Sequence, residues 1–280
     1  MYEQYWGLKE RPFQNTPDPR FFYYSSQHEE ALTRLVYAIE EQLGAAMLTG
    51  IFGCGKTMVV HALFEELAKS GNYKIAYVTN PQLGATEMLR SIAYYIGVPN
   101  LPEKKTDIMT DFLVEKIEET LKNNWADGKH TVLVIDEAHL IEDKAIQEEL
   151  RLLLNFQLPD RFLLSLLLVG QPELRRNMDN NKQFSQRVAI KCHLDRFNEE
   201  DTKKYIMHRL KVAGCHPDKC TPGKPELLFT EAALKLIFEG SGGIPRRVNH
   251  ICNMALLSGY GKNIQRIDTD IIHDVIKEME

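Results

Sequence analysis

The sequence has few cysteines and no long hydrophobic run. Its five cysteines, an odd number, fit reduced thiols better than a disulfide framework. The longest apolar run, "FLLSLLLVG", has the length of a strand, whereas a membrane span needs about 18 to 20 residues. The first residues, "MYEQYWGLKERPF", lack the basic and apolar regions of a signal peptide. We therefore expect a cytoplasmic protein with no direct membrane insertion, which reaches the periphery of the inner membrane only through a partner.

The sequence also lacks an excess of positive charge. A net charge of −5 gives no global attraction to nucleic acid or to an anionic membrane, but it does not exclude a local basic surface. With 280 residues, 44% hydrophobic and 26% charged, the chain is typical of a soluble globular protein with one large or two modest domains.

A zinc site has only weak support. Cys215, His216 and Cys220, with Cys192 and His193 upstream, are metal-ligand types, but their spacing is loose and no second clean pair follows. A polar surface loop is the favoured interpretation of "GCHPDKCTPGKPE".

Apolar strands alternate with amphipathic helices through the first two thirds of the chain. The expected strands are "AAMLT", "KIAYVT", "TVLVIDE", "FLLSLLLVG" and "RVAIKCHL". The expected helices are "HEEALTRLVYAIEEQL", "KTMVVHALFEELAKS", "ATEMLRSIAYYIG", "TDIMTDFLVEKIEETLKNN" and "KAIQEELRLLLNFQL". Nearly continuous apolar strands predict a parallel five-stranded sheet covered by helices on both faces.

After about Asp195 only helices are expected. Asn198, Thr230 and Asp268 are candidate N-caps of three of them. We therefore predict an α/β domain over 1–195, which includes a proline- and aromatic-rich N-terminal arm, and a small all-α domain over 196–280.

Residues 50–57, "GIFGCGKT", match the phosphate-binding pattern G-x-x-x-x-G-K-[ST] between a strand and a helix. Glycines let successive backbone N–H groups turn inward around an anion, and the following helix adds the positive end of its dipole. Lys56 is expected to reach the β- and γ-phosphates of ATP or ADP, and Thr57 to bind Mg²⁺. The alternative is a glycine-rich turn with a chance lysine. The expected nucleotide contacts are Gly50, Phe52, Gly53, Cys54, Gly55, Lys56, Thr57 and Met58.

Two acidic residues follow the apolar strand in "TVLVIDEAHL". Ligands bind at the carboxyl ends of strands in open α/β sheets. Asp136 is expected to hold Mg²⁺, directly or through water, and Glu137 to act as the base that polarises the attacking water. The alternative is that these acids only cap the next helix.

Gln171 ends the strand "FLLSLLLVG". If that strand lies between the two motif strands, the Gln171 amide points at the γ-phosphate and can orient the attacking water. The alternative is a helix-capping glutamine before Pro172.

With these motifs in place, the sequence resembles an AAA+ ATPase, and specifically the ExeA/GspA family. The resemblance covers nearly the whole chain and is carried by the N-terminal block, by "GIFGCGKT" and "VLVIDEAHL", and by "LLLNFQL", "LLLVGQPELRR" and "GGIPRRVNHICNMALL". It implies a P-loop αβα sandwich followed by a helical lid, and a ring or spiral of identical subunits.

The resemblance also implies roles for two arginines. Arg187 corresponds to an arginine finger that reaches the γ-phosphate of a neighbouring subunit; the alternative is a surface arginine. Arg246, in "GGIPRRVN", corresponds to the residue of the lid that touches nucleotide in its own subunit; the alternative is a solvent-facing arginine at a helix start. Pro19, Phe21, Phe22 and His28 correspond to a possible wall of the adenine pocket, although an aromatic stripe is more often core.

Cys54 departs from many phosphate loops, and a thiol beside an anion nest is expected to have a lowered pKa and to be reactive. Secretion-type members of the family continue into a membrane helix and a peptidoglycan-binding domain, whereas this sequence stops at Glu280.

Three functions stay open. The first is an ATPase that drives assembly or remodelling of a secretion or envelope complex through protein partners. The second is a transposition-type ATPase that polymerises on duplex DNA, for which Lys203, Lys204, Arg209 and Lys211 offer a basic helix face and Arg175 with Arg176 a second basic patch. The third is a nucleotide-gated adaptor with little turnover, which the base at Glu137 disfavours.

Overall fold

The computed structural model describes residues 2–102, 109–214 and 228–279. By its contacts the chain divides into two compact units. The α/β unit comprises Gln27–Phe52 and Val59–Leu194, and the helical unit comprises Met1–Ser26, Gly53–Met58 and Asp195–Glu280.

The α/β unit contains the predicted parallel five-stranded sheet. Its strands are β1 (Ala45–Gly50), β2 (Tyr73–Val78), β3 (His130–Ile135), β6 (Leu164–Gly170) and β7 (Val188–Leu194). The order across the sheet is β2-β3-β6-β1-β7, and all neighbours are parallel. All residues of β1, β3 and β6 are buried, as expected for central strands covered on both faces.

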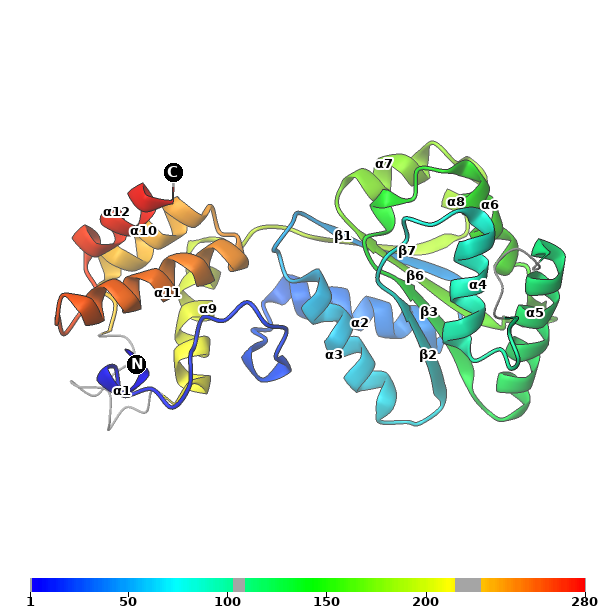
Figure 1. Ribbon diagram of the computed structural model, residues 1–280, viewed down its shortest axis with the longest axis horizontal. Helices are drawn as coiled ribbons and strands as arrows, with labels where there is room; N and C mark the ends of the chain where they lie inside the picture. The colour runs from blue at the N-terminus through cyan, green and yellow to red at the C-terminus, as the bar shows by residue number, and fades with distance from the viewer. Residues whose placement is uncertain (1, 103–108, 215–227, 280) are drawn as a thin grey trace. The chain divides into compact units, whose positions relative to one another are not determined.

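Helices cover both faces of this sheet (Figure 1). They are α2 (Ser26–Glu40), α3 (Lys56–Ala68), α4 (Ala85–Ile96), α5 (Thr110–Ala126) and α6 (Lys144–Leu153). One apolar cluster joins α4, α5 and α6 to alternate strand residues such as Met47, Leu133 and Leu168. The intervening residues, among them Leu48 and Val134, are equally buried and face the opposite side.

Short elements complete the α/β unit. They are η3 (Ala138–Leu140), α7 (Glu173–Asp179), α8 (Lys182–Ser185) and a hairpin of β4 (Gln157–Leu158) and β5 (Arg161–Phe162). The prediction of one helix through "KAIQEELRLLLNFQL" is therefore wrong at its end. The helix stops at Leu153, because Leu158 and Arg161 pair across a tight turn and Phe156 bonds to Leu163.

The helical unit follows the predicted pattern after Asp195. Its helices are α9 (Glu199–Val212), α10 (Glu231–Ser241), α11 (Pro245–Gly261) and α12 (Thr269–Glu278). The predicted caps are confirmed, since the side chains of Asn198, Thr230 and Asp268 each accept a bond from the first helical turn. Gly243 has a φ of +70°, and a Cβ there would lie 2.0 Å from the Phe197 carbonyl oxygen, so only glycine fits between α10 and α11.

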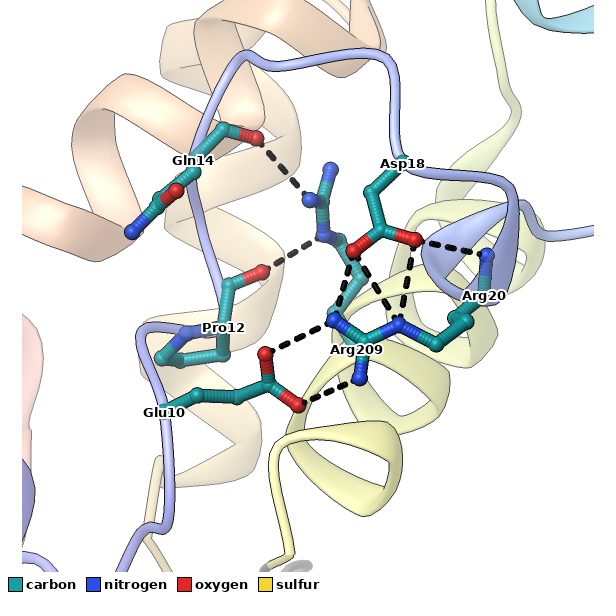
Figure 2. Close-up of polar contacts among 6 residues, drawn as sticks. All are labelled: Glu10, Pro12, Gln14, Asp18, Arg20 and Arg209. Atoms are coloured by element: carbon teal, nitrogen blue, oxygen red, sulfur yellow. Dashed lines mark hydrogen bonds and ion pairs between the residues drawn. The ribbon is translucent and has the colours of Figure 1, made fainter.

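The N-terminal arm packs on these helices, with two short elements, α1 (Tyr2–Tyr5) and η1 (Pro19–Phe21). Buried Arg209 of α9 donates to the carbonyl oxygens of Pro12 at 2.6 Å and Gln14 at 2.9 Å (Figure 2). Its guanidinium also lies 4.9 Å from the Phe21 ring centroid. Close by, Arg20 bridges Glu10 and Asp18. The arm was expected to belong to the α/β domain, whereas its contacts place it in the helical unit. The predicted domain boundaries, 1–195 and 196–280, stay a prediction.

Candidate functional site

Three neighbouring strands bring the predicted motifs to one edge of the sheet. β6 lies between β3 and β1, with Leu168 opposite Ile135 and Gly170 opposite Thr49. The strands are parallel, so Asp136, Gln171 and the loop after Gly50 all start at their carboxyl ends. This is the arrangement on which the interpretation of Gln171 depended.

The carboxyl end of β1 is tied to β7 by a hydroxyl. Thr49 Oγ1 donates to the Cys192 carbonyl oxygen at 3.1 Å and lies 2.9 Å from His193 Nδ1. One hydroxyl proton and two acceptor sites allow both contacts when the imidazole donates. These bonds fix the strand from which the predicted phosphate loop begins. Cys192 and His193 are thus used in the sheet.

The loop adopts the backbone that the glycine pattern predicted. Gly53 has a φ of +80° and Gly55 a φ of +101°, in the region that favours glycine. Helix α3 begins at Lys56, whose side chain is buried, while Thr57 in its first turn is exposed. A helix start of this kind presents free backbone N–H groups to an anion.

Arg246 lies directly against this loop. Its backbone N–H donates to the Gly53 carbonyl oxygen at 3.3 Å, and a Cβ on Gly53 would come within 2.8 Å of the Arg246 Cβ. Arg246 occupies the first turn of α11, after Pro245, and its side chain is exposed. The sequence-predicted lid arginine and the sequence-predicted phosphate loop are therefore adjacent within the helical unit.

The expected reactivity of Cys54 is wrong. Cys54 is 1% exposed, and burial raises the pKa of its thiol despite the opposing charge of Lys56. Burial disfavours the thiolate, so this residue packs as a small apolar group.

Asp136 is buried at the end of β3 and accepts two hydrogen bonds. The Tyr77 hydroxyl donates to Oδ2 at 2.7 Å, and the Glu137 backbone N–H donates to Oδ1 at 2.8 Å. Burial, and then the bond to Asp136, raise the pKa of Tyr77, which stays protonated as a donor. A carboxylate has about four acceptor sites, so two remain for Mg²⁺ or its water, and oxygen ligands suit that ion. Tyr77 was not among the predicted site residues, because nothing local in the sequence links β2 to β3.

Glu137 stands in a strained backbone conformation. Its φ of 51° and ψ of 31° lie in the left-handed region, which non-glycine residues seldom adopt and which often marks functional sites. The turn directs its side chain to His139, whose Nδ1 lies 3.3 Å from Glu137 Oε2. The side chain of Glu137 is 39% exposed and remains open to a ligand.

Gln171 meets the same histidine from the next strand. Its Nε2 lies 3.0 Å from His139 Nε2, and its backbone N–H lies 3.4 Å from His139 Nδ1. Asp136, Glu137 and Gln171 thus form one group, linked by the Glu137 backbone N–H and by His139. His139 lies within "TVLVIDEAHL", but its role could not be predicted from the sequence, because it depends on the contact with β6.

Arg187 lies at the opposite edge of the sheet. It immediately precedes β7, and its Nη2 donates to Asn155 Oδ1 at 3.1 Å. Because β7 is parallel to its neighbour, Arg187 marks the amino edge. It does not join Glu137 and Gln171 in its own subunit.

The residues expected to form an adenine wall or a zinc site lie in other parts of the chain. Phe21 packs under Arg209 in the helical unit, and the Phe22 ring centroid lies 4.4 Å from that of Tyr24. Pro19 begins η1 and His28 is buried in α2, and the adenine wall expected from these four residues stays a prediction. Cys215, His216 and Cys220 lie outside the described residues. Among the residues that the structure describes, no group of three metal-ligating side chains is found. Within the same residues, no helix has the length and apolar character needed to cross a bilayer.

The sequence is similar to a protein family and to a curated relative. A family model described as an AAA domain matches residues 39–178. General secretion pathway protein A of Aeromonas hydrophila is 36% identical over 270 residues, which cover 95% of this chain and 46% of that protein. The chain therefore spans about half the length of this relative.

Solved structures share the fold. The ORC2 protein of Aeropyrum pernix aligns with a TM-score of 0.69 at 18% identity, covering 96% of this chain and 72% of that one. Cdc6p of Pyrobaculum aerophilum aligns with a TM-score of 0.71 at 18% identity, covering 93% and 70%. Identities this low show the fold alone.

Proposed function

This chain belongs to the AAA domain family and is related to general secretion pathway protein A; on that premise we propose that it is an Mg²⁺-dependent ATPase that assembles around nucleotide and remodels or recruits a partner complex. The observation that carries the proposal is the alignment of Asp136, Glu137 and Gln171 at the carboxyl edge of adjacent strands, beside the strand that feeds the phosphate loop.

The residues of the loop would bind the triphosphate of ATP. Backbone N–H groups of the loop and the ammonium of Lys56 would face the phosphate oxygens, and the burial of Lys56 would strengthen its interaction with them. Thr57 and Asp136 would hold Mg²⁺, which neutralises charge on the β- and γ-phosphates when bound. This assignment requires Thr57 and Asp136 to share one ion.

Glu137 and Gln171 would act on the attacking water. A carboxylate that is 39% exposed, at the mouth of the site, can accept a proton from water. The Gln171 amide orients that water or contacts the γ-phosphate. Arg246 would contact the nucleotide from the helical unit, since its helix starts against Gly53.

The position of Arg187 supports a site shared between subunits. β7 has seven residues and spans about 20 Å. Arg187 at its amino end therefore lies too far from the carboxyl edge to act on nucleotide there. An arginine that serves the site of a neighbour would couple hydrolysis to a ring or spiral of identical chains.

The charges of the helical unit favour a protein partner over duplex DNA. Lys203 pairs with Glu231 at 2.8 Å, Lys204 pairs with Glu200 at 3.3 Å, and Arg209 is buried under the N-terminal arm. Two of the four residues of the expected basic face of α9 are thus paired with acids and Arg209 is buried, whereas Lys211, Arg175 and Arg176 remain exposed. We propose action in the cytoplasm, at the inner membrane through a partner.

The proposal is tested by ATP turnover and nucleotide affinity. Lys56→Ala is expected to abolish ATP binding, whereas Glu137→Gln is expected to bind ATP normally and lose on the order of 100-fold or more in turnover. Normal turnover by Glu137→Gln would show that the base is wrongly assigned.

Two further experiments test whether the chain assembles and whether its partner is protein or DNA. Arg187→Ala is expected to bind ATP without assembly-dependent turnover, and mixing it with Lys56→Ala restores part of the activity if the site is shared. Duplex DNA across a salt series is expected to leave turnover unchanged; steep, salt-sensitive stimulation would favour the DNA-targeting alternative.

A further inference from the structure

The His139 side chain connects the two groups that the proposed mechanism assigns to the attacking water. One ring nitrogen, Nδ1, lies 3.3 Å from Glu137 Oε2, and the other, Nε2, lies 3.0 Å from Gln171 Nε2. We propose that His139 is a positioning residue for hydrolysis, whose ring holds the Glu137 carboxylate and links it to the Gln171 amide. This inference rests on the proposed ATPase function and deepens it.

The proposal assigns the ring proton to Nδ1, the nitrogen that faces Glu137. In the structure, the Gln171 amide nitrogen faces His139 Nε2 and donates to it, because an amide nitrogen has no lone pair to offer. A neutral ring then carries its proton on Nδ1, the atom that faces Glu137. The orientation of the amide and the tautomer follow from this hydrogen-bond network.

A longer contact competes with this assignment. The Gln171 backbone N–H lies 3.4 Å from Nδ1, near the limit of a hydrogen bond, and would need a lone pair there. The opposite tautomer would satisfy it, but would also turn that lone pair toward the Glu137 carboxylate. The Nδ1–H tautomer avoids this repulsion, which is the reason for the assignment, since either tautomer can keep the 3.0 Å contact once the amide is oriented to match it.

The ring is held more firmly than the carboxylate that it contacts. The His139 side chain is 11% exposed, compared with 39% for Glu137. Asn177 Nδ2 donates to the His139 carbonyl oxygen at 3.2 Å. A Cβ on Gly170 would lie 3.0 Å from the His139 backbone nitrogen and 3.3 Å from Nδ1, so this glycine permits the close approach of η3 to β6.

A well-buried donor beside a more exposed carboxylate restricts the orientations that the carboxylate can adopt. The base must lie within about 3 Å of the water that it activates, and small displacements reduce the rate strongly. The same ring also contacts the Gln171 amide. If that amide moves when nucleotide binds, the His139 ring would change the position of Glu137. His139 therefore acts through Glu137, without touching the nucleotide.

Three substitutions at His139 separate its contacts. The amide nitrogen of asparagine lies near the position of Nδ1, and that of glutamine near Nε2. His139→Ala and His139→Gln are expected to lower kcat on the order of 10- to 100-fold, with KM and ATP affinity within about twofold of the wild type. His139→Asn is expected to retain most of kcat, because it keeps a donor toward Glu137. His273→Ala, at an exposed histidine of α12, is the matched control.

A combined variant tests whether His139 acts through Glu137. Adding His139→Ala to Glu137→Gln is expected to lower kcat no further. Additive losses would overturn the proposal. So would an unchanged kcat in His139→Ala, or a loss of ATP affinity parallel to the loss of kcat.

The ring nitrogens give a readout that needs no turnover. In ¹⁵N spectra of the full chain, His139 is expected as the Nδ1–H tautomer. Glu137→Gln should shift mainly the Nδ1 resonance and Gln171→Ala mainly Nε2. An Nε2–H tautomer would overturn the link. If the wild-type chain shows no more turnover than Lys56→Ala, the proposed ATPase function fails, while these spectra still decide the His139 contacts.

Discussion

The α/β unit and the helical unit hold distant parts of the chain together in different ways. In the α/β unit, strands far apart in sequence meet through apolar side chains, and β1, β3 and β6 are buried along their whole length. In the helical unit, the N-terminal arm is held both by apolar packing and by hydrogen bonds between side chains and backbone carbonyls. Arg209 binds two arm carbonyls, and Trp6 Nε1 donates to the Leu256 carbonyl oxygen at 2.9 Å.

This difference affects how each unit responds to substitution. Apolar packing is non-directional, so a sheet core tolerates changes that conserve volume and loses stability when a cavity is left. The hydrogen bonds of a buried guanidinium are directional, and removing the guanidinium leaves buried acceptors without donors. The two units should therefore be weakened selectively by different kinds of substitution.

The largest effect is expected from a cavity in the sheet. Leu133→Ala, at a fully buried position of β3, should reduce the free energy of unfolding of the α/β unit by about 3 kcal/mol. Hydrogen exchange should accelerate in the strands and not in the N-terminal arm. Leu152→Ala, at a leucine of α6 that is 39% exposed, is the control and should cost much less. Equal losses would mean that the core of β3 is loosely packed.

A comparable or slightly smaller effect is expected from removing the arginine that holds the arm. Arg209→Met keeps an apolar stem but leaves the carbonyls of Pro12 and Gln14 without this donor, which should cost about 2 to 3 kcal/mol in the helical unit. Limited proteolysis should then cleave within the arm. Lys203→Met breaks an exposed ion pair with Glu231 and should cost less than about 1 kcal/mol. An arm that stays protected in Arg209→Met would show that apolar packing suffices.

A smaller, acid-dependent effect is expected in the α/β unit. Burial lowers the pKa of His130 to about 4, and its Nδ1 is buried without a hydrogen-bond partner. An unfolded histidine binds its proton near pH 6.5, so the stability from this residue is complete above that pH and falls as pH drops toward 4. Between pH 7.5 and pH 5 the loss should be about 2 kcal/mol.

His130→Gln is the variant that checks this acid dependence. Its amide can keep the contact with Ser165 Oγ, which lies 2.8 Å from His130 Nε2, while removing the titration. In urea unfolding measured from pH 7.5 to pH 5, the loss of unfolding free energy should be about 2 kcal/mol smaller in this variant than in the wild type. An unchanged pH profile would assign the acid sensitivity to other groups.

Much of the α/β unit could be predicted because its signals are local. The five strands and their parallel pairing follow from periodicity, and in the helical unit the caps at Asn198, Thr230 and Asp268 follow from single residues at helix starts. The loop at 50–57 combines a sequence pattern with glycines that have positive φ. The helix expected through Leu158 ended early, because cross-strand pairing overrides the propensity of "LLLNFQL".

Other features could not be predicted, because they depend on residues that are distant in the chain. Arg209 was expected on a basic surface and is buried on Pro12 and Gln14. Tyr77 reaches Asp136 from the neighbouring strand, and His139 meets Gln171 only because β3 and β6 are adjacent. Cys54 was expected to be reactive beside the phosphate loop, but burial opposes its ionisation.

The amino-acid sequence by itself determined which elements form and which residues carry phosphate-loop, acidic and amide chemistry, since hydrophobic period, glycine placement and caps act over a few residues. Tertiary structure alone decided the strand order that sets Gln171 beside Asp136 and Glu137, the contacts of His139 and Tyr77, and the anchoring of the N-terminal arm. Those depend on which surfaces exclude water together, and such pairing is a property of the whole folded chain.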